Sequence, residues 1–291
     1  KVIDTHIHAD HISGIAELRD QTNCVTIMGD KTPADVVSMQ VSDEELIKID
    51  GLEFKALFTP GHTSESFSFL MKDRVFTGDT LLIRGTGRTD FQNGSPLDSY
   101  NSIFKKLLKL PDDTLVYPAH DYKGDSVSTI IEEKKFNPRL QVNSVDEYIE
   151  IMNSLNLPDP KLMDIAVPSN LKLGIDFNKQ KVNNGIEPEE FKKLLAEKNS
   201  IVIDLREQSE IDKNGKITNS IIIPFPTISN YLNKNKDKLY NKKILFYCAI
   251  GQRSTLAVQI SKSYKYNNSF HLIGGLQNWK KKAFHYDNLY N

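Results

Sequence analysis

The strongest sequence feature is a cluster of four potential metal ligands. It follows the short apolar stretch Val2-Ile3 and precedes a helical pattern of apolar residues, and it reads His6-x-His8-x-Asp10-His11. A tight turn at the end of a strand can point alternate side chains into one cavity. Imidazole and carboxylate ligands together suit zinc or iron better than magnesium or calcium. The cluster therefore predicts a transition-metal site at the end of a strand.

Three further residues of the same kind follow apolar stretches in turn-like segments, namely His62, Asp79 and His120. Loops at strand ends are where α/β scaffolds place chemistry, because the sheet holds the loop and the loop holds the ligand. Taken singly, Asp79 could be a turn residue and His120 a surface group. Their occurrence together with the first cluster indicates one shared site.

The length of the chain and the pattern of its apolar segments indicate two domains. The chain has 291 residues, about twice the size of a typical domain. The N-terminal part carries short apolar runs separated by turn signals, including a predicted hairpin over 67–78, and then amphipathic helical patterns. After a connector at 157–185, which is rich in proline and polar residues, strands alternate with helices. We predict domains at 1–176 and 177–291, both of the α/β class, and a surface helix over 230–243.

Composition narrows the range of partners. With 37 basic and 38 acidic residues the formal net charge is −1, so there is no charge signal for nucleic acid or for an anionic membrane. No apolar stretch approaches the roughly 20 residues that a membrane-spanning helix needs, and no secretory signal opens the chain. Small molecules are the expected partners and the cytoplasm is the expected location. A homo-oligomer is allowed but not indicated.

The C-terminal part contains a cysteine in a distinctive loop. Cys248 follows the apolar strand 244–247 and opens the loop 248–253, after which a helical pattern begins. A thiol that faces backbone N–H groups and a helix N-terminus is expected to have a lowered pKa, which makes it a nucleophile. Arg253 at the end of the loop is a candidate for binding an anionic sulfur donor. Two cysteines are too few for a disulfide framework, and Cys24 is interpreted as structural.

In the order of its motifs, the N-terminal part resembles the metallo-β-lactamase superfamily, whose fold is an αββα sandwich. Within that superfamily, the segments 82–92, 117–122 and 137–140 are similar to the persulfide dioxygenases. The resemblance implies one non-haem Fe(II) held by His6, His62 and Asp79. The remaining motif residues would surround these ligands or form a second site, and they are His8, Asp10, His11 and His120.

This resemblance also implies a reaction. Two histidines and one carboxylate occupy one face of an octahedral metal and leave positions for substrate sulfur and dioxygen. The implied reaction is O₂-dependent oxidation of a low-molecular-weight thiol persulfide, such as glutathione persulfide, to sulfite and thiol. Arg88 and Arg139 are our candidates for anchoring an anionic substrate, because a guanidinium group binds a carboxylate through two hydrogen bonds.

The Cys248 loop, together with the segments 203–207 and 273–279, resembles the rhodanese sulfurtransferases. That resemblance implies a parallel-sheet α/β domain in which Cys248 carries the transferred sulfur as a persulfide. It also suggests that Asp204 and Arg206 form a structural pair near the loop. The order of the two domains is similar to that of bacterial persulfide dioxygenase–rhodanese fusions, in which sulfur passes to a thiol or joins sulfite to give thiosulfate.

Two alternatives stay open. A glyoxalase II-like binuclear zinc thioester hydrolase would use the same motif residues, with Asp79 bridging two zinc ions. A non-catalytic sulfur-binding or sensing protein would need only an incomplete metal site and Cys248. Metallo-β-lactamase folds usually place several strands before the first motif, which here begins at His6. We therefore expect an N-terminally incomplete chain with an exposed sheet edge.

Overall fold

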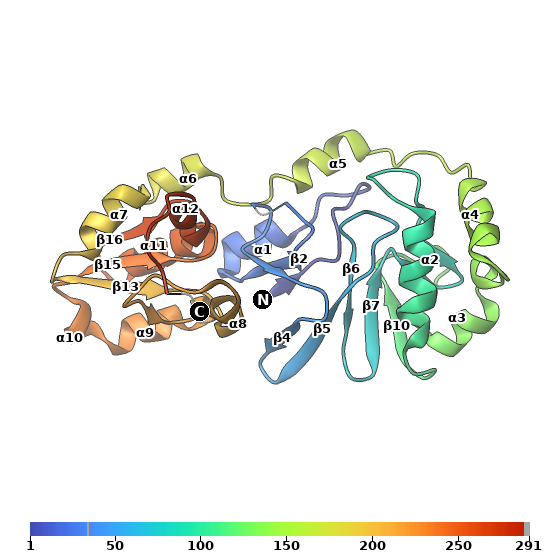
Figure 1. Cartoon of the computed structure of the whole chain (residues 1–291), viewed down its shortest axis with the longest axis horizontal. Coiled ribbons are helices and arrows are strands. Elements are labelled where there is room, and N and C mark those ends of the chain that lie inside the picture. The colour runs from blue at the N-terminus through green and yellow to red at the C-terminus, as the bar shows by residue number, and fades with distance from the viewer. Residues whose placement is uncertain (34, 288–291) are drawn as a thin grey trace.

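The computed structural model describes residues 1–33 and 35–287. Two α/β units lie side by side along the long axis of the molecule, and helices α5 (Met163–Asn170) and α6 (Phe177–Val182) run between them along the top of the view (Figure 1). None of the helices in the described ranges has the length and apolar character needed to cross a membrane.

The N-terminal unit is built on a six-stranded sheet with strand order β11-β10-β7-β6-β5-β4. Its strands are β4 (Leu46–Ile49), β5 (Leu52–Phe58), β6 (Phe67–Leu70), β7 (Arg74–Gly78), β10 (Leu115–Pro118) and β11 (Ser128–Thr129). The predicted hairpin is confirmed, because β6 and β7 are antiparallel and Leu70 pairs with Val75. β7 and β10 are parallel, so the loops that follow these two strands leave from the same edge of the sheet. A small hairpin of β8 (Leu81–Leu82) and β9 (Gly85–Thr86) comes after β7.

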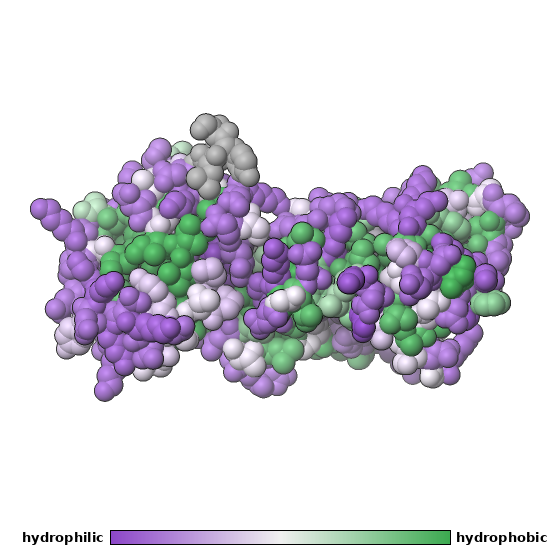
Figure 2. Space-filling model, turned by 90° about the horizontal axis from the view of Figure 1, so that it is seen from below, coloured by the Kyte–Doolittle hydropathy of each residue, from purple (hydrophilic) through white to green (hydrophobic). Residues whose placement is uncertain are grey.

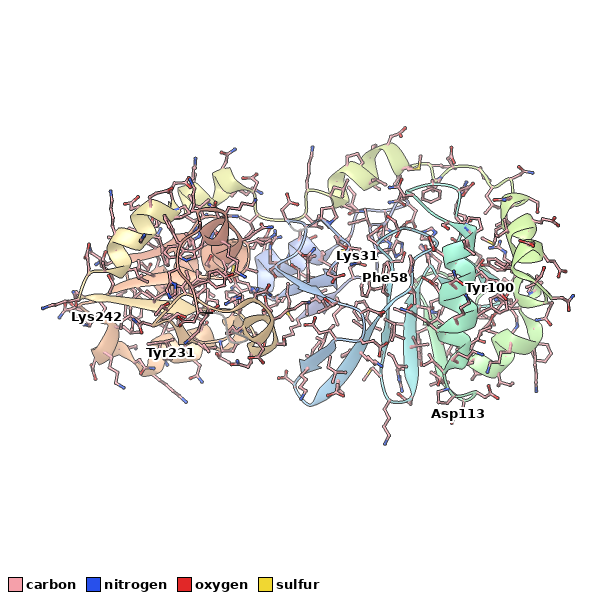
Figure 3. The ribbon with its side chains drawn as sticks, in the orientation of Figure 1. Lys31, Phe58, Tyr100, Asp113, Tyr231 and Lys242 are labelled. Carbon is pink, nitrogen blue, oxygen red and sulfur yellow. The ribbon has the colours of Figure 1, made fainter. Side chains whose placement is uncertain are left out.

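Three helices cover the outer face of this sheet. They are α2 (Pro96–Lys105), α3 (Ile130–Phe136) and α4 (Val145–Asn153). Ile103 and Tyr148 from α2 and α4 are fully buried in one cluster with Val75 and Val116 of the sheet, which is how the predicted amphipathic faces find their partner. Tyr100, labelled in Figure 3, stacks on Phe104 one turn later, with 4.3 Å between ring centroids.

A second, parallel sheet packs on the other face. It has the order β1-β2-β3, with strands β1 (Val2–Ile3), β2 (Thr26–Gly29) and β3 (Met39–Val41), and helix α1 (Ile15–Thr22) lies beyond it. A Cβ atom at Gly29 would lie 2.0 Å from the ring of Phe67, so glycine lets the two sheets approach. From left to right, Figure 1 shows α1, the two sheets and then α2 with α4, which is the expected αββα order. β1 forms one edge of this sheet.

The C-terminal unit is a five-stranded sheet in which every pairing is parallel, in the order β12-β16-β15-β13-β14. The strands are β12 (Gly185–Ile186), β13 (Ser200–Asp204), β14 (Ile221–Ile222), β15 (Lys243–Tyr247) and β16 (Ser269–Leu272). The helices are α7 (Pro188–Leu195), α8 (Gln208–Asn214), α9 (Ile228–Lys234), α10 (Lys236–Leu239), α11 (Gln252–Ser263) and α12 (Gly275–Lys281). β13 and β15 alternate their side chains between two apolar clusters, one on each face of the sheet. The predicted surface helix over 230–243 is found as two short helices, α9 and α10, which end at Leu239, and Lys243 already belongs to β15.

The connector differs from the expected linker. It contains α5 and α6, and two of its polar residues, Asn170 and Gln180, are buried. The Asp176 side chain caps α6 by accepting the backbone N–H of Lys179. This cap stabilises α6, because it satisfies a backbone N–H group at the helix start that would otherwise be left to water.

Polar contacts are among those that join the two units. The Gln252 side chain donates to the carbonyl of Asp35 at 2.7 Å, Lys213 lies 3.5 Å from Glu45, and Lys1 lies 3.3 Å from Glu207. On the face shown in Figure 2, hydrophilic residues separate smaller groups of hydrophobic residues.

Candidate metal centre and sulfur-transfer loop

Three of the predicted ligands meet at one point. His6 follows β1, His62 lies between β5 and β6, and Asp79 follows β7 directly. One ligand atom from each lies within 4.8 Å of the other two. Nε2 of His6 and Nε2 of His62 lie 3.8 and 3.6 Å from Oδ2 of Asp79. The structure therefore assembles two imidazoles and one carboxylate from three loops that are distant in the chain.

The neighbours of these ligands fix how the rings point. The Nδ1–H of His62 donates to the carbonyl of Arg88 at 2.8 Å, which leaves Nε2 with its lone pair for the centre. Nδ1 of His6 lies 2.9 Å from the hydroxyl of Thr5. A Cβ atom at Gly87 would lie 2.0 Å from the carbonyl oxygen of Asp79 and 2.9 Å from Nδ1 of His62, so only glycine lets this loop lie so close to the ligands.

The charge states also suit a metal site. Burial, together with the neighbouring His8, lowers the pKa of His6 to about 3, so its imidazole is neutral. For Asp79, burial works against the charged form, but the hydrogen bond from His120 and the nearby imidazoles outweigh it and hold its pKa below the usual range. A neutral imidazole and an ionised carboxylate are the protonation states that a metal ion requires of such ligands.

The other motif residues lie next to this centre in a second group. His8, Asp10 and His11 also offer ligand atoms within 4.8 Å of one another. Nε2 of His8 is 2.8 Å from Oδ1 of Asp4, and its buried Nδ1 has no hydrogen-bond partner among the described residues. His120 links the two groups, because its ring nitrogens lie 2.7 Å from Asp79 and 2.9 Å from Asp10.

Sequence reasoning missed a residue that holds the motif loop. The side-chain amide of Asn170 in α5 donates to the carbonyls of His8 and His11 at 2.8 and 2.9 Å and accepts the backbone N–H of Ser13 at 2.9 Å. Glu65 acts similarly on the loop, since it accepts the N–H of Ile7 at 2.8 Å. No local pattern could have identified Asn170, because its partners lie about 160 positions away.

The two arginines proposed for substrate binding are both engaged within the chain. Arg88 forms two hydrogen bonds of 2.6 Å with Asp90 and one of 2.6 Å with the carbonyl of Pro158. Arg139 donates to the carbonyl and hydroxyl of Thr86, and burial lowers its pKa. In the structure both residues hold the loop that packs against the metal ligands, and a contact of either one with substrate stays a prediction.

Cys248 lies where the sequence predicted, at the end of β15 and before α11. Its Sγ accepts the N–H of Gly251 at 3.2 Å, lies 3.8 Å from the hydroxyl of Ser254, and has no exposed surface. Gly251 adopts a φ of 96°, in the left-handed region that favours glycine. The loop therefore folds around the sulfur and turns the backbone N–H of Gly251 toward it.

Arg253 does not form the expected rim of this loop. Its side chain is 1% exposed, and two of its nitrogens donate to Glu210 of α8 at 2.7 and 2.6 Å. The guanidinium group thus fastens the start of α11 to α8, and direct contact with substrate stays a prediction. The expected pair of Asp204 and Arg206 is confirmed by hydrogen bonds of 2.9 and 2.6 Å.

A second missed residue supports the loop from the connector. Gln180 of α6 donates to the carbonyl of Ile250 at 3.3 Å and accepts the N–H of Gly274 at 2.9 Å. Its backbone carbonyl accepts Nε2–H of His271 at 3.0 Å, so Nδ1 of that ring faces the hydroxyl of Ser254 at 3.4 Å. The polar composition of the connector gave no sign that it reaches the loop.

The two folds and their sites define a metallo-β-lactamase fold followed by a rhodanese-like domain, and comparison with known families agrees. The family model for the metallo-beta-lactamase superfamily matches residues 1–120, and the rhodanese-like domain model matches residues 187–282. Both resemblances predicted from the sequence are confirmed.

Relatives identify the family more closely. The human mitochondrial persulfide dioxygenase ETHE1 is 42% identical over 176 residues, which cover 60% of this chain and 68% of the relative. A hydroxyacylglutathione hydrolase from Rhodopseudomonas palustris is 33% identical over 180 residues, which cover 60% of this chain and 69% of the relative. The chain belongs to the metallo-β-lactamase superfamily, as a relative of the persulfide dioxygenases that carries a C-terminal rhodanese-like domain.

Two solved structures bear on the fold. The crystal structure of ETHE1 from Myxococcus xanthus aligns at a TM-score of 0.57 with 51% identity and covers 58% of this chain and 75% of its own. A metallo-beta-lactamase from Staphylococcus aureus aligns at a TM-score of 0.52 with 21% identity and covers 94% of this chain and 83% of its own. The second likeness concerns the fold alone, and it extends over both units.

Proposed function

We propose that this protein oxidises a low-molecular-weight thiol persulfide, such as glutathione persulfide, to sulfite and thiol, and that its second domain transfers sulfane sulfur through Cys248. The observation that carries the proposal is the convergence of His6, His62 and Asp79, whose ligand atoms lie within 4.8 Å of one another. The 42% identity to a persulfide dioxygenase supports it independently.

The donor set fits a single iron(II) ion, with zinc as the alternative metal. Two imidazole nitrogens and one carboxylate oxygen form the facial triad that non-haem oxygenases use, and each donor atom here is turned to a common point. Bound iron would supply the reaction of persulfide sulfur with O₂.

The protein's own groups would prepare this centre. The Arg88 carbonyl holds the proton of His62 at Nδ1, and Asn170 holds the backbone of the motif loop. His120 occupies Oδ1 of Asp79 at 2.7 Å, which leaves Oδ2 for the metal. We propose that Arg88 and Arg139 shape the substrate side of the pocket through the loop that they hold.

A glyoxalase II-like zinc thioester hydrolase is the second candidate. It is favoured by the second group of ligands, His8, Asp10 and His11, and by the 33% identity to a hydroxyacylglutathione hydrolase. Zinc held by these residues would supply the activation of water for hydrolysis of a thioester, and O₂ would not be consumed.

An oxygen electrode separates the two candidates. We expect iron-loaded protein to consume O₂ when glutathione persulfide is added and to release sulfite. Lactoyl-glutathione serves as the comparison substrate. Hydrolysis of that thioester by the zinc-loaded protein, with no O₂ uptake on persulfide by the iron-loaded one, would favour the hydrolase instead.

The two proposed activities should be separable at Cys248. Cys248→Ser removes the nucleophile and should abolish sulfur transfer from thiosulfate, while O₂ uptake with preformed persulfide continues. Thiocyanate formation from thiosulfate and cyanide measures the first activity, and the oxygen electrode measures the second. Cys24→Ser is the control and should keep both. Loss of both activities in Cys248→Ser would contradict separate sites.

A further inference from the structure

A cavity of about 370 Å³ lies between the two domains, next to the Cys248 loop. Ala249 and Ile250, which follow the cysteine directly, form part of its wall. The first domain contributes Asp30 and Glu45, and helices α8 and α12 of the second domain contribute Lys213 and Lys280. Figure 1 shows α8 on the side of the second domain that faces the first. The volume lies within the range of ~300–1,000 Å³ that is usual for small-molecule sites.

Most of the charges in this cavity already have partners. Arg206 and Glu210 also line it, and both belong to the buried ion pairs described above. Glu45 accepts the N–H of Ser42 at 3.0 Å and lies 3.5 Å from Lys213, whose ammonium also binds the Ser42 hydroxyl. These groups give the cavity a fixed polar wall and leave little charge for a ligand.

Lys280 is a cation without such a partner. Among the described residues no carboxylate forms an ion pair with it, and its ammonium lies 4.5 Å from the centre of the Tyr286 ring. Burial and the positive charge of Arg206 lower its pKa, as expected for two cations that face one space. An anion placed there would relieve this repulsion.

Asp30 is the complementary acceptor on the part of the wall that the first domain forms. Its Oδ2 accepts the hydroxyl of Ser42 at 2.6 Å. Its Oδ1 is buried and accepts no hydrogen bond from any described residue, although the exposed ammonium of Lys31 lies 3.4 Å away. The Asp30 side chain is nevertheless 29% exposed, and Oδ2, which accepts one hydrogen bond from Ser42, has the capacity to accept a second one from a ligand.

We propose that this cavity binds the thiol that exchanges sulfur with Cys248, and that this thiol is a zwitterion whose carboxylate meets Lys280 and whose ammonium meets Asp30. The inference rests on the proposed sulfur transfer through Cys248. It makes the first domain part of the acceptor site of the second, so that Asp30 helps to determine which thiol is used.

The step itself needs no oxidant. The acceptor thiolate attacks the outer sulfur of the Cys248 persulfide, and a new S–S bond forms to the acceptor. The bond between that sulfur and Cys248 breaks with its electron pair on Cys248. The proton released by the acceptor thiol balances the proton taken up by the Cys248 thiolate, and the transferred sulfur keeps its oxidation state.

Acceptor selectivity of the full-length protein tests the proposal. Cys248 is loaded with thiosulfate, and transfer is measured to glutathione, 3-mercaptopropionate, cysteamine and cyanide. Glutathione carries both charges, the next two carry only the carboxylate or only the ammonium, and cyanide is small enough to need no site. We expect glutathione to have the lowest KM of the three thiols.

Two variants test the proposed carboxylate contact and the proposed ammonium contact separately. Lys280→Met should raise KM about tenfold for glutathione and 3-mercaptopropionate, which carry a carboxylate, but not for cysteamine. Asp30→Asn should raise KM about tenfold for glutathione and cysteamine, which carry an ammonium group, but not for 3-mercaptopropionate. A change of this size is expected for the loss of one charged hydrogen bond. Lys281→Met, from the same helix, and Asp113→Asn, which Figure 3 places on the side of the first domain away from the second, are the matched controls.

The cyanide reaction keeps the two hypotheses apart. Equal KM values for the three thiols, or variants that slow every acceptor alike, would overturn the zwitterion site while transfer to cyanide shows that Cys248 works. If transfer to cyanide also fails in the wild-type protein, the proposed sulfurtransferase function is wrong and the inference fails with it.

Discussion

At His62, one ring nitrogen is committed to the protein and the other is left free. The Arg88 carbonyl accepts the hydrogen bond from Nδ1–H, and Gly87 lets the loop that carries this carbonyl approach the ring. Asp79 is divided in the same way, because His120 holds Oδ1 and the imidazoles of His6 and His62 face Oδ2. Such a division orients the donor atoms before any metal binds, which raises metal affinity.

Metal content tests these assignments. Asp79→Ala removes the only carboxylate of the proposed triad and should reduce bound iron from about one per chain to nearly none. Asp10→Ala is the matched comparison, since Asp10 belongs to the second group and should not be needed for the first metal. Elemental analysis of the purified variants measures both. Stoichiometric iron in Asp79→Ala, or two metals per wild-type chain, would contradict a single-iron centre.

His271 should make stability depend on pH. Burial lowers its pKa from 6.5 to about 4, so the unfolded chain binds a proton between these values while the folded chain does not. The contribution of His271 is therefore complete above pH 6.5, falls as the pH drops through this window, and is lost near pH 4. Urea unfolding from pH 7 to pH 4 should show a smaller loss of stability for His271→Gln. Identical slopes would show that His271 does not titrate in this window.

At the scale of elements, the start of α11 is held by a buried ion pair as well as by the sheet. Arg253 joins it to Glu210 of α8, while Arg206 binds Asp204 at the end of β13 and the carbonyl of Gly215 after α8. Both guanidinium groups are almost fully buried. The elements around the Cys248 loop are thus fixed by charges that cannot be removed singly without cost.

Breaking one of these pairs should be severe. Glu210→Gln leaves the Arg253 charge buried without its counter-ion and should lower the free energy of unfolding by about 3–5 kcal/mol. The double variant Glu210→Leu, Arg253→Met removes both charges and should be less destabilised than Glu210→Gln. Chemical denaturation of the two variants measures this order. A double variant that is less stable than the single one would show that the pair contributes net stability.

At the scale of the whole molecule, the domains are more closely joined than the connector sequence suggests. A single apolar cluster includes Ile27 of the first sheet, Ile175 of the connector and Leu256 of α11. Gln252 adds a hydrogen bond across the interface. Apolar burial shared between two folding units couples their stabilities.

Calorimetry should reveal this coupling. We expect the two domains of the metal-free protein to unfold in overlapping transitions, because loss of one exposes apolar surface of the other. Gln252→Ala leaves the Asp35 carbonyl without its donor and should lower the unfolding temperature. Two well-separated transitions in the wild-type protein, unchanged by Gln252→Ala, would show that the domains unfold independently.

Much of this arrangement could be predicted from the sequence. The metal ligands lie in short motifs after strands, and Cys248 lies between a strand and a helix, so local pattern was enough to place them. The supporting residues could not be found in this way. Asn170 and Gln180 act on loops far away in the chain, and Arg253 lies inside rather than at the rim because its partner, Glu210, comes from another helix. Long-range partners of polar side chains are set by tertiary packing, which local periodicity does not encode.

The hydrogen bonds from Asn170 to the His8 and His11 carbonyls have a practical consequence for protein engineering. Asn170 belongs to the connector between the domains, yet its side-chain amide holds the metal-binding turn of the first domain in place. A shortened protein that keeps only residues 1–120, the range that matches the superfamily, would lack Asn170. When the C-terminal domain is exchanged for another domain, the junction should lie after α5, so that Asn170 is kept and still holds the metal-binding turn.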